Sequence, residues 1–515
     1  MRRALLIAAA AAALAGGALA APRSAGIKDP DTRAWFQLTE QLSGDAMEGR
    51  DIGSPGFDRA AQVVADRFRA AGLKPAGDGG GWFQVFPVHE SKVEKAELTI
   101  SLANGRTGTV RFLQDFSVRA ADDLPPSVEA PVMWAGFCRP SDLVTARGKW
   151  VVCVNTRWKG LTTGAERVAN ARNAGAVGLV QMDDPSFTIE PFRWPAAYAR
   201  TVTNGDKPAP VTGGFPVLTA SVAAVHTMLG EPASRALLNP NGRAATPPFA
   251  TSSTMRAAFT VSRRDYTAKN VVALMPGADP TLKDQILAVS AHLDGYGYGT
   301  PVKGDRLYNG ALDDAAYVAT LVRFADKHRG APLKRSVLLL VTTGEEKGLL
   351  GAHWFVDHPT VPKSAIVADI NLDQLRPLFP LKILTELAVD DSTLGVTARQ
   401  VAASMGIRIQ PDPEPERSLL TRADHYPFMQ AGIPATGFIF GYEPGTDAER
   451  RYREWYQVRY HRPQDDLTQP MDFQAAGDFN RFFYKLAETV ADTEAKPGWI
   501  RSPPGPWVKR VERVR

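Results

Sequence analysis

Three short apolar segments constrain the fold of this chain more than any other feature of its sequence. They occupy residues 285–291, 336–343 and 365–372, and none of them alternates between apolar and polar positions. Continuous apolarity of this kind is typical of a strand that is buried on both faces. Helical patterns at residues 315–327 and 349–356 separate the segments. Alternating strands and helices predict an α/β fold, in which a mostly parallel sheet is flanked by helices.

Polar residues follow each of these segments directly. His292 ends the first, Glu345 and Glu346 come just after the second, and Asp373 ends the third. The carboxyl ends of parallel strands meet at one edge of a sheet, and ligands bind there. The complete set of candidate residues, in chain order, is His292, Asp294, Asp313, Asp314, Glu345, Glu346, Asp373 and His461.

This set matches the needs of a site for two zinc ions. Zinc binds imidazole nitrogen and carboxylate oxygen, and a catalytic zinc keeps one position open for water. Two metal ions about 3.5 Å apart need a carboxylate that bridges them and further ligands at each end. We therefore assign His292 and Asp373 to one zinc ion, Glu346 and His461 to the other, and Asp313 to the bridge.

Two acidic residues remain beside this predicted ligand set. Glu345 is adjacent to a ligand, and we expect it to be the general base that takes a proton from the bridging water. Asp294 lies two residues after His292. Its carboxylate is expected to accept the second imidazole N–H, which would fix the tautomer of that ligand.

Several short motifs carry a resemblance to a known family. They are AHLDG at 291–295, YNGALDDA at 308–315, GEEKGLLG at 344–351, NLD at 371–373, ADHYPF at 423–428 with AGIP at 431–434, and YHRPQD at 460–465. On these motifs the chain resembles secreted members of metallopeptidase family 28, the di-zinc aminopeptidases that also include glutamate carboxypeptidase relatives. The resemblance implies the same ligand assignment and a phosphorylase/hydrolase-like fold.

The same resemblance implies further details of the site. The peptide bond between Asp313 and Asp314 is expected to be cis. Tyr460 is expected either to donate to the oxyanion of the tetrahedral intermediate or to serve only as a packing residue. His425 is expected to support the ligands without binding metal. Ala316 and Tyr317 stand where relatives commonly have Ser-Gly, so the shape of the substrate pocket is expected to differ.

The two ends of the chain and its cysteines indicate the compartment. Residues 1–20 have the basic start, apolar run and small residues of a signal peptide, which predicts a periplasmic or secreted protein. The apolar run is too short to span a membrane. Cys138 and Cys153 are either a disulfide, which export permits, or two buried thiols. Residues 496–515 form a basic, proline-rich tail, for which we expect no nucleic-acid role despite the formal net charge of +5.

The length of 515 residues predicts more than one domain. Residues 28–95 and 251–495 are expected to form the catalytic domain, with a helix that begins after Ser54. Residues 96–250 have short predicted strands and a helix near 165–174, and resemble a mainly β, lid-like protease-associated domain. Its expected role is to shape access to the cleft.

An exported aminopeptidase that acts on peptides is the leading functional hypothesis. A carboxypeptidase or dipeptidase for acidic peptides is the first alternative, because Arg376 and Arg422 could meet a substrate carboxylate. A glutaminyl cyclase with a single zinc ion comes next, followed by a non-catalytic, receptor-like protein. The residue preferred at the cleaved bond, the native metal and the oligomeric state stay open, since cobalt or manganese could use the same ligands.

Overall fold

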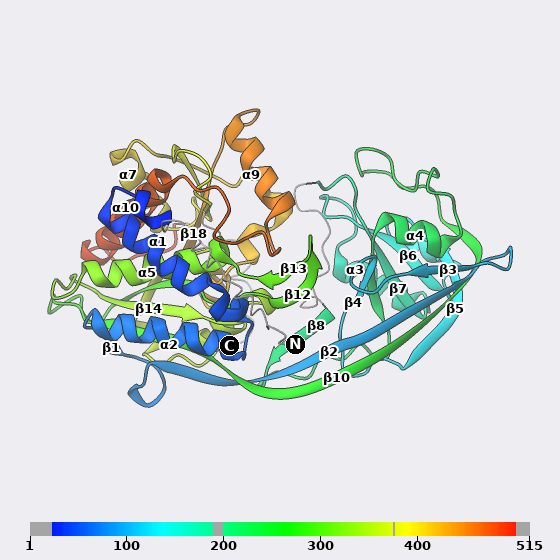
Figure 1. Cartoon of the computed structure of the whole chain (residues 1–515), viewed down its shortest axis with the longest axis horizontal. Coiled ribbons are helices and arrows are strands. Elements are labelled where there is room, and N and C mark those ends of the chain that lie inside the picture. The colour runs from blue at the N-terminus through cyan, green and yellow to red at the C-terminus, as the bar shows by residue number, and fades with distance from the viewer. Residues whose placement is uncertain (1–22, 189–198, 374–375, 501–515) are drawn as a thin grey trace, which may run out of the picture.

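The computed structural model describes residues 23–188, 199–373 and 376–500 of the chain. Among these residues, one mixed β-sheet runs through the whole molecule, and helices cover it (Figure 1). The expected signal peptide lies outside the described residues, as does the part of the expected tail after residue 500. None of the described helices combines the length and the apolarity that a membrane span requires.

The strands that carry the candidate residues lie side by side in the sheet. β11 (Ile286–His292) pairs in parallel with both β14 (Ser336–Thr342) and β15 (Ile366–Leu372). Every residue of these three strands is buried. The prediction of buried, mostly parallel strands is therefore confirmed. The sheet continues from β15 through β18 (Ala435–Phe440), β16 (Ile383–Leu387) and β17 (Arg408–Gln410).

Helices cover both faces of this part of the sheet. The larger core lies under α1 (Pro30–Ser43), α2 (Pro55–Ala70), α5 (Ala316–Lys327), α7 (Thr393–Ser404), α9 (Asp447–Val458) and α10 (Phe473–Asp492). On the opposite face, α6 (Leu350–Asp357) and α8 (His425–Gln430) enclose a smaller core. The expected helix after Ser54 is α2, whose first turn is capped by the Ser54 hydroxyl, which accepts the N–H of Phe57 at 3.1 Å.

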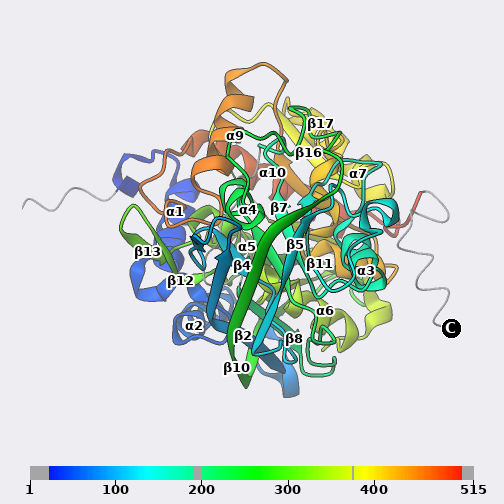
Figure 2. The same cartoon turned by 90° about the vertical axis from the view of Figure 1, so that its right-hand side faces the viewer.

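The insertion is attached through two long antiparallel strands. β2 (Phe83–Ser101) and β10 (Phe249–Met275) pair along almost their whole length and join the two parts of the molecule. Figure 2, which looks onto the insertion, shows β2, β10 and β5 (Ser127–Trp134) lying side by side. The expected domain boundaries at residues 95 and 250 therefore fall at or inside continuous strands, and the division into domains stays a prediction.

The insertion itself combines strands and helices. From β5 its sheet continues in parallel through β6 (Trp150–Asn155), β7 (Gly178–Asp183) and β9 (Val217–Ala220), with α3 (Gly164–Asn173) and α4 (Val222–Leu229) packed on it. Cys138 and Cys153 form a disulfide inside this part. The remaining strands are β1 (Lys74–Pro75), β3 (Thr107–Val110), β4 (Phe116–Val118), β8 (Arg200–Asn204), β12 (Gly297–Val302) and β13 (Asp305–Tyr308).

Candidate metal centre

The predicted site residues meet at the carboxyl edge of the sheet. His292 is the last residue of β11, and its backbone pairs with Thr342 at the end of β14. Ala291 pairs with Leu372, the residue before Asp373. The polar residues that end or follow the three strands therefore lie at the same edge of the sheet. Asp313 comes from the turn before α5 and His461 from the loop after α9.

Two groups of donor atoms converge there and share Asp313. One group is His292, Asp313 and Asp373, and the other is Asp313, Glu346 and His461. His292 Nε2 lies 3.3 Å from Asp313 Oδ1 and 3.8 Å from Asp373 Oδ1. His461 Nε2 lies 3.4 Å from Asp313 Oδ2 and 3.2 Å from Glu346 Oε2. The two imidazoles thus face opposite oxygens of one carboxylate.

These distances suit a metal ion better than they suit hydrogen bonds. Donors that surround a tetrahedral zinc ion at about 2.0–2.2 Å lie about 3.3–3.6 Å from one another. His292 Nε2 and Asp313 Oδ2 are both buried, and neither has a hydrogen-bond partner in the part of the chain that the structure describes, which is costly unless another group binds them. Imidazole nitrogen and carboxylate oxygen are also the donors that zinc prefers. The residues therefore fit a pair of zinc ions.

The electrostatics of the cluster also favour a bound cation. Burial raises the pKa of Glu345 well above its ordinary value and also raises the pKa of Asp373. Burial acts in the same direction on Asp313, but the two adjacent imidazoles outweigh it and hold the pKa of Asp313 well below its usual range. Carboxylates packed this closely away from water repel one another. A bound cation would remove that repulsion.

Asp465 holds the backbone of the bridging residue. Its carboxylate oxygens accept the N–H groups of Leu312 at 3.1 Å and Asp313 at 3.0 Å, and Gln469 donates to one of them at 2.6 Å. The peptide bond from Asp313 to Asp314 is cis, as the resemblance implied. Asp465, the last residue of the YHRPQD motif, thus positions Asp313, the predicted bridging ligand.

Arg50 ties three remote segments together beneath the site. Its guanidinium is completely buried and donates to the backbone carbonyls of Leu42, Leu293, Asn309 and Gly310 at 2.6–2.9 Å. Leu293 follows the ligand His292, and Gly310 precedes the turn that carries Asp313. Burial lowers the pKa of Arg50 to about 10, which leaves it charged at neutral pH. One side chain from the amino-terminal segment therefore fixes the spacing of both loops.

The structure corrects the expected role of the Asp294 carboxylate. The Nδ1–H of His292 donates to the backbone carbonyl of Asp294 at 3.1 Å, whereas the nearest carboxylate oxygen of Asp294 is 3.7 Å away. The carboxylate instead accepts the backbone N–H of Glu345 at 3.1 Å and that of Glu346 at 3.4 Å. Asp294 therefore holds the backbone of Glu345 and Glu346 in place.

Glu345 and Tyr460 lie beside the two donor groups. Glu345 Oε2 is 4.0 Å from His292 Nε2, at the edge of the first donor group. The ring of Tyr460 stacks on that of His461, with centroids 3.6 Å apart, and its hydroxyl oxygen accepts a hydrogen bond from Arg422 at 3.1 Å. His425 lies outside both donor groups, and its Nε2 donates to the carbonyl of Leu420 at 2.8 Å.

Sequence reasoning missed Tyr296. Its hydroxyl lies 3.1 Å from Nδ1 of His461, and its ring meets the imidazole edge to face at 4.7 Å. The ammonium group of Lys347 lies 4.4 Å from the centre of the same ring. The only available signal was the position of Tyr296 four residues after a ligand, which is equally typical of a packing residue.

The structure separates the two arginines that we considered for a substrate carboxylate. Arg376 is fully buried, and its guanidinium lies over the rings of Trp455 and Tyr456 at 4.2 and 4.5 Å. It is therefore part of the core under α9. Arg422 is half-buried and contacts Tyr460 beside the donor groups.

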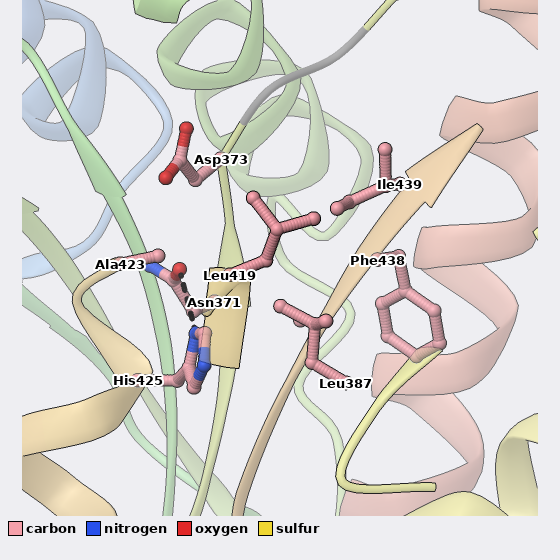
Figure 3. Close-up of a pocket in the computed structure, with 9 residues that line it drawn as sticks. Asn371, Asp373, Leu387, Leu419, Ala423, His425, Phe438 and Ile439 are labelled. Atoms are coloured by element: carbon pink, nitrogen blue, oxygen red, sulfur yellow. Dashed lines mark hydrogen bonds between the residues drawn. The ribbon is translucent and has the colours of Figure 1, made fainter. Parts of the chain in front are cut away.

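An apolar pocket adjoins the site on the side of Asp373. Figure 3 shows Leu387, Leu419, Phe438 and Ile439 around this pocket, with Asp373 at its edge. Asn371, Ala423, His425 and Gly437 complete its lining.

Comparisons with known proteins agree with this geometry. Residues 270–487 match the model of peptidase family M28. Leupeptin-inactivating enzyme 1 of Streptomyces exfoliatus is 24% identical over 255 residues, which are 47% of this chain and 54% of the relative. Aminopeptidase YwaD of Bacillus subtilis is 24% identical over 227 residues, 42% of this chain and 43% of the relative. The chain thus spans about half the length of these curated relatives.

Solved structures show that the likeness in fold extends further. The aminopeptidase from Aneurinibacillus sp. strain AM-1 superimposes with a TM-score of 0.60 and 16% identity, over 90% of this chain and 95% of the other. The zinc aminopeptidase BSAP of Bacillus subtilis gives a TM-score of 0.57 with 18% identity, over 90% of this chain and 96% of the other. The shared fold therefore includes the insertion as well as the sheet that carries the donor groups.

Proposed function

We propose that this chain, in which residues 270–487 match the model of peptidase family M28, is a zinc-dependent aminopeptidase that removes N-terminal residues from peptides. The observation that carries this proposal is the pair of donor groups that share Asp313. Glu345, a carboxylate not needed as a ligand, lies beside them. Two relatives with aminopeptidase names, YwaD and BSAP, support the choice of reaction and, for BSAP, of metal.

In this proposal the donor groups hold two zinc ions. His292 and Asp373 would hold one ion and Glu346 and His461 the other, and Asp313 would belong to both sets of ligands. When bound, zinc supplies Lewis acidity that polarises the scissile carbonyl and makes water acidic enough to lose a proton near neutral pH. The Asp294 carboxylate and the Asp465 carboxylate keep the ligands in place through the backbone N–H groups that they accept.

Glu345 moves the proton in the proposed reaction. It accepts a proton from the water that attacks the carbonyl carbon and passes it to the amine that leaves when the C–N bond breaks. Burial raises the pKa of Glu345, which increases its affinity for that proton. Its backbone N–H donates to Asp294, and this hydrogen bond fixes the backbone of Glu345 at the edge of the first donor group.

Tyr460 is the proposed hydrogen-bond donor to the oxyanion. Arg422 donates to the phenol oxygen at 3.1 Å, and this polarises the O–H toward a developing negative charge. The stacking on His461 keeps the phenol beside the second donor group.

Activity on two substrate classes tests the proposal. The zinc-loaded protein is expected to hydrolyse an amino-acid p-nitroanilide and to leave an N-blocked peptide intact. The Glu345→Gln variant should lose about 10²–10⁴-fold in kcat while it still binds zinc. Hydrolysis of the blocked peptide alone would favour the carboxypeptidase or dipeptidase alternative. One zinc ion per chain would favour the glutaminyl cyclase, and inactivity on all peptides the receptor-like protein.

We also propose that the chain is exported to the periplasm or beyond. The signal-peptide pattern of residues 1–20 supports export, and the Cys138–Cys153 disulfide is typical of an oxidising compartment. Sequencing the amino terminus of the protein recovered outside the cytoplasm tests this, and a chain that keeps residues 1–20 would contradict it.

A further inference from the structure

A cavity between the insertion and the peptidase part has no assigned role. Its volume is about 360 Å³, and its walls come from the loop between β6 and α3 on one side and from residues 416–422 on the other. Figure 1 shows α3 on the side of the insertion that faces the peptidase part. The charged side chains that line the cavity are Arg157, Arg167, Glu416, Arg417 and Arg422. Four guanidinium groups and one carboxylate thus surround the space.

Among these charged groups, Arg167 has an unusual environment because it is almost completely buried. It is 2% exposed, and its guanidinium donates to the carbonyls of Thr156 and Thr162 and to Asn155 Oδ1. Its Nε–H is buried and has no hydrogen-bond partner among the described residues. Glu166 and Asp184 act on the guanidinium through their charges, but none of the ion pairs formed by the described residues includes Arg167. Buried charges in proteins are normally paired with an opposite charge. The wall of the cavity therefore contains a buried cation that an anion would stabilise.

Arg417 and Arg422 are fixed in place by contacts of their own. Arg417 is buried and donates to Glu414 at 3.2 Å and to the hydroxyl of Tyr452 at 2.6 Å. Arg422 donates to the carbonyl of Arg417 and to Tyr460. At the start of α3, the Glu166 carboxylate accepts the N–H and O–H of Thr163, so this helix end already carries a negative charge. The guanidinium groups therefore give the cavity a positively charged lining.

The cavity lies within reach of a peptide held at the donor groups. Arg422 contacts the hydroxyl of Tyr460, whose ring stacks on the predicted ligand His461. The path from the His461 ring across Tyr460 to Arg422 adds up to at most about 10 Å, which an extended peptide covers in about two to three residues. A peptide cleaved after its first residue would bring its third residue to this cavity.

We propose that this cavity binds a carboxylate of the peptide substrate, on the carboxyl side of the cleaved bond. The inference rests on the proposed aminopeptidase function and adds a preference to it. The carboxylate is either the free C-terminus of a short peptide or an acidic side chain near the third position. Guanidinium groups bind both, because their parallel N–H donors match the two carboxylate oxygens.

Matched tripeptides test the proposal in the zinc-loaded, full-length protein. Leu-Ala-Ala is compared with its C-terminal amide, and Leu-Ala-Asp amide with Leu-Ala-Asn amide. We expect kcat/KM to be about tenfold higher for the carboxylate-bearing member of at least one pair, mainly through KM. A preference in the first pair alone identifies the C-terminus, and one in the second pair alone identifies an acidic side chain. Equal kcat/KM in both pairs overturns the inference.

Variants connect the preference to the cavity. Arg167→Gln and Arg157→Gln should reduce the carboxylate preference toward unity, and Arg157, which is exposed, covers the case in which the buried Arg167 variant fails to fold. Arg106→Gln, an exposed arginine of the insertion outside the cavity, is the control and should keep the preference. A preference that survives both cavity variants overturns the inference. Absence of hydrolysis for all four tripeptides and the p-nitroanilide instead contradicts the proposed function.

Discussion

Removing the hydroxyl of Tyr296 is expected to weaken metal binding at one position of the centre and not at the other. In the Tyr296→Phe variant, Nδ1 of His461 loses a hydrogen-bond partner at 3.1 Å while the ring packing stays. His292 keeps its own partner, because that partner is the backbone carbonyl of Asp294. A neutral hydrogen bond contributes about 1–1.5 kcal/mol, which is about tenfold in affinity. Loss of a group that orients a ligand typically costs about 10–100-fold.

Titration of metal-free protein with zinc against a chromophoric chelator measures both dissociation constants. We expect one constant to rise about tenfold or more and the other to change little. Tyr308→Phe is a matched control, since Tyr308 packs against Tyr296 but donates to the carbonyl of Thr300. Two unchanged constants, or the same loss in the control, would refute the reasoning that the phenol orients His461.

Three further predictions concern stability. Arg50→Met removes the donor for four buried carbonyls and should lower the free energy of unfolding by about 4 kcal/mol, measured in urea; a loss below about 1 kcal/mol would contradict the role of Arg50. Burial raises the pKa of Glu386 to about 8 from an ordinary 4.5, so its stabilising effect is complete below pH 4.5 and is lost as the pH rises to about 8. Glu386→Gln should therefore raise Tm at pH 8 more than at pH 5, and equal shifts at the two pH values would argue against the burial effect. Chelation of the metal should lower Tm by several degrees, because the carboxylates around Asp313 then repel one another; an unchanged Tm would mean that the centre does not depend on a cation.

The strands and the donor groups could be predicted because both depend on local patterns. A buried parallel strand is apolar at every position, and a residue at its carboxyl end has to lie at the edge of the sheet. His292 and Asp373 are fixed in this way by the strands β11 and β15. Asp313 and His461 come from loops, and their assignment rested on the ligands that two zinc ions need and on the family motifs.

Other parts of the site depend on the path of the chain, which the sequence does not display. The hydrogen bond of His292 goes to a backbone carbonyl, and a carbonyl leaves no trace in a motif. Arg50 has a positive φ of 52° and reaches carbonyls of segments about 240 to 260 positions away. Tyr296 approaches His461 only after the loop that follows α9 has folded back. Such contacts need the assembled structure.

The paired strands β2 and β10 have a mechanical consequence for the insertion. Their backbone hydrogen bonds run on from one part of the molecule into the other, with a single register shift between Thr260 and Val261. A flexible peptide tether between two bodies would permit free rotation, but a hydrogen-bonded ribbon resists it and yields only by bending and twisting. The cavity beside Arg167 can therefore widen or narrow as the ribbon flexes while both of its walls keep their alignment.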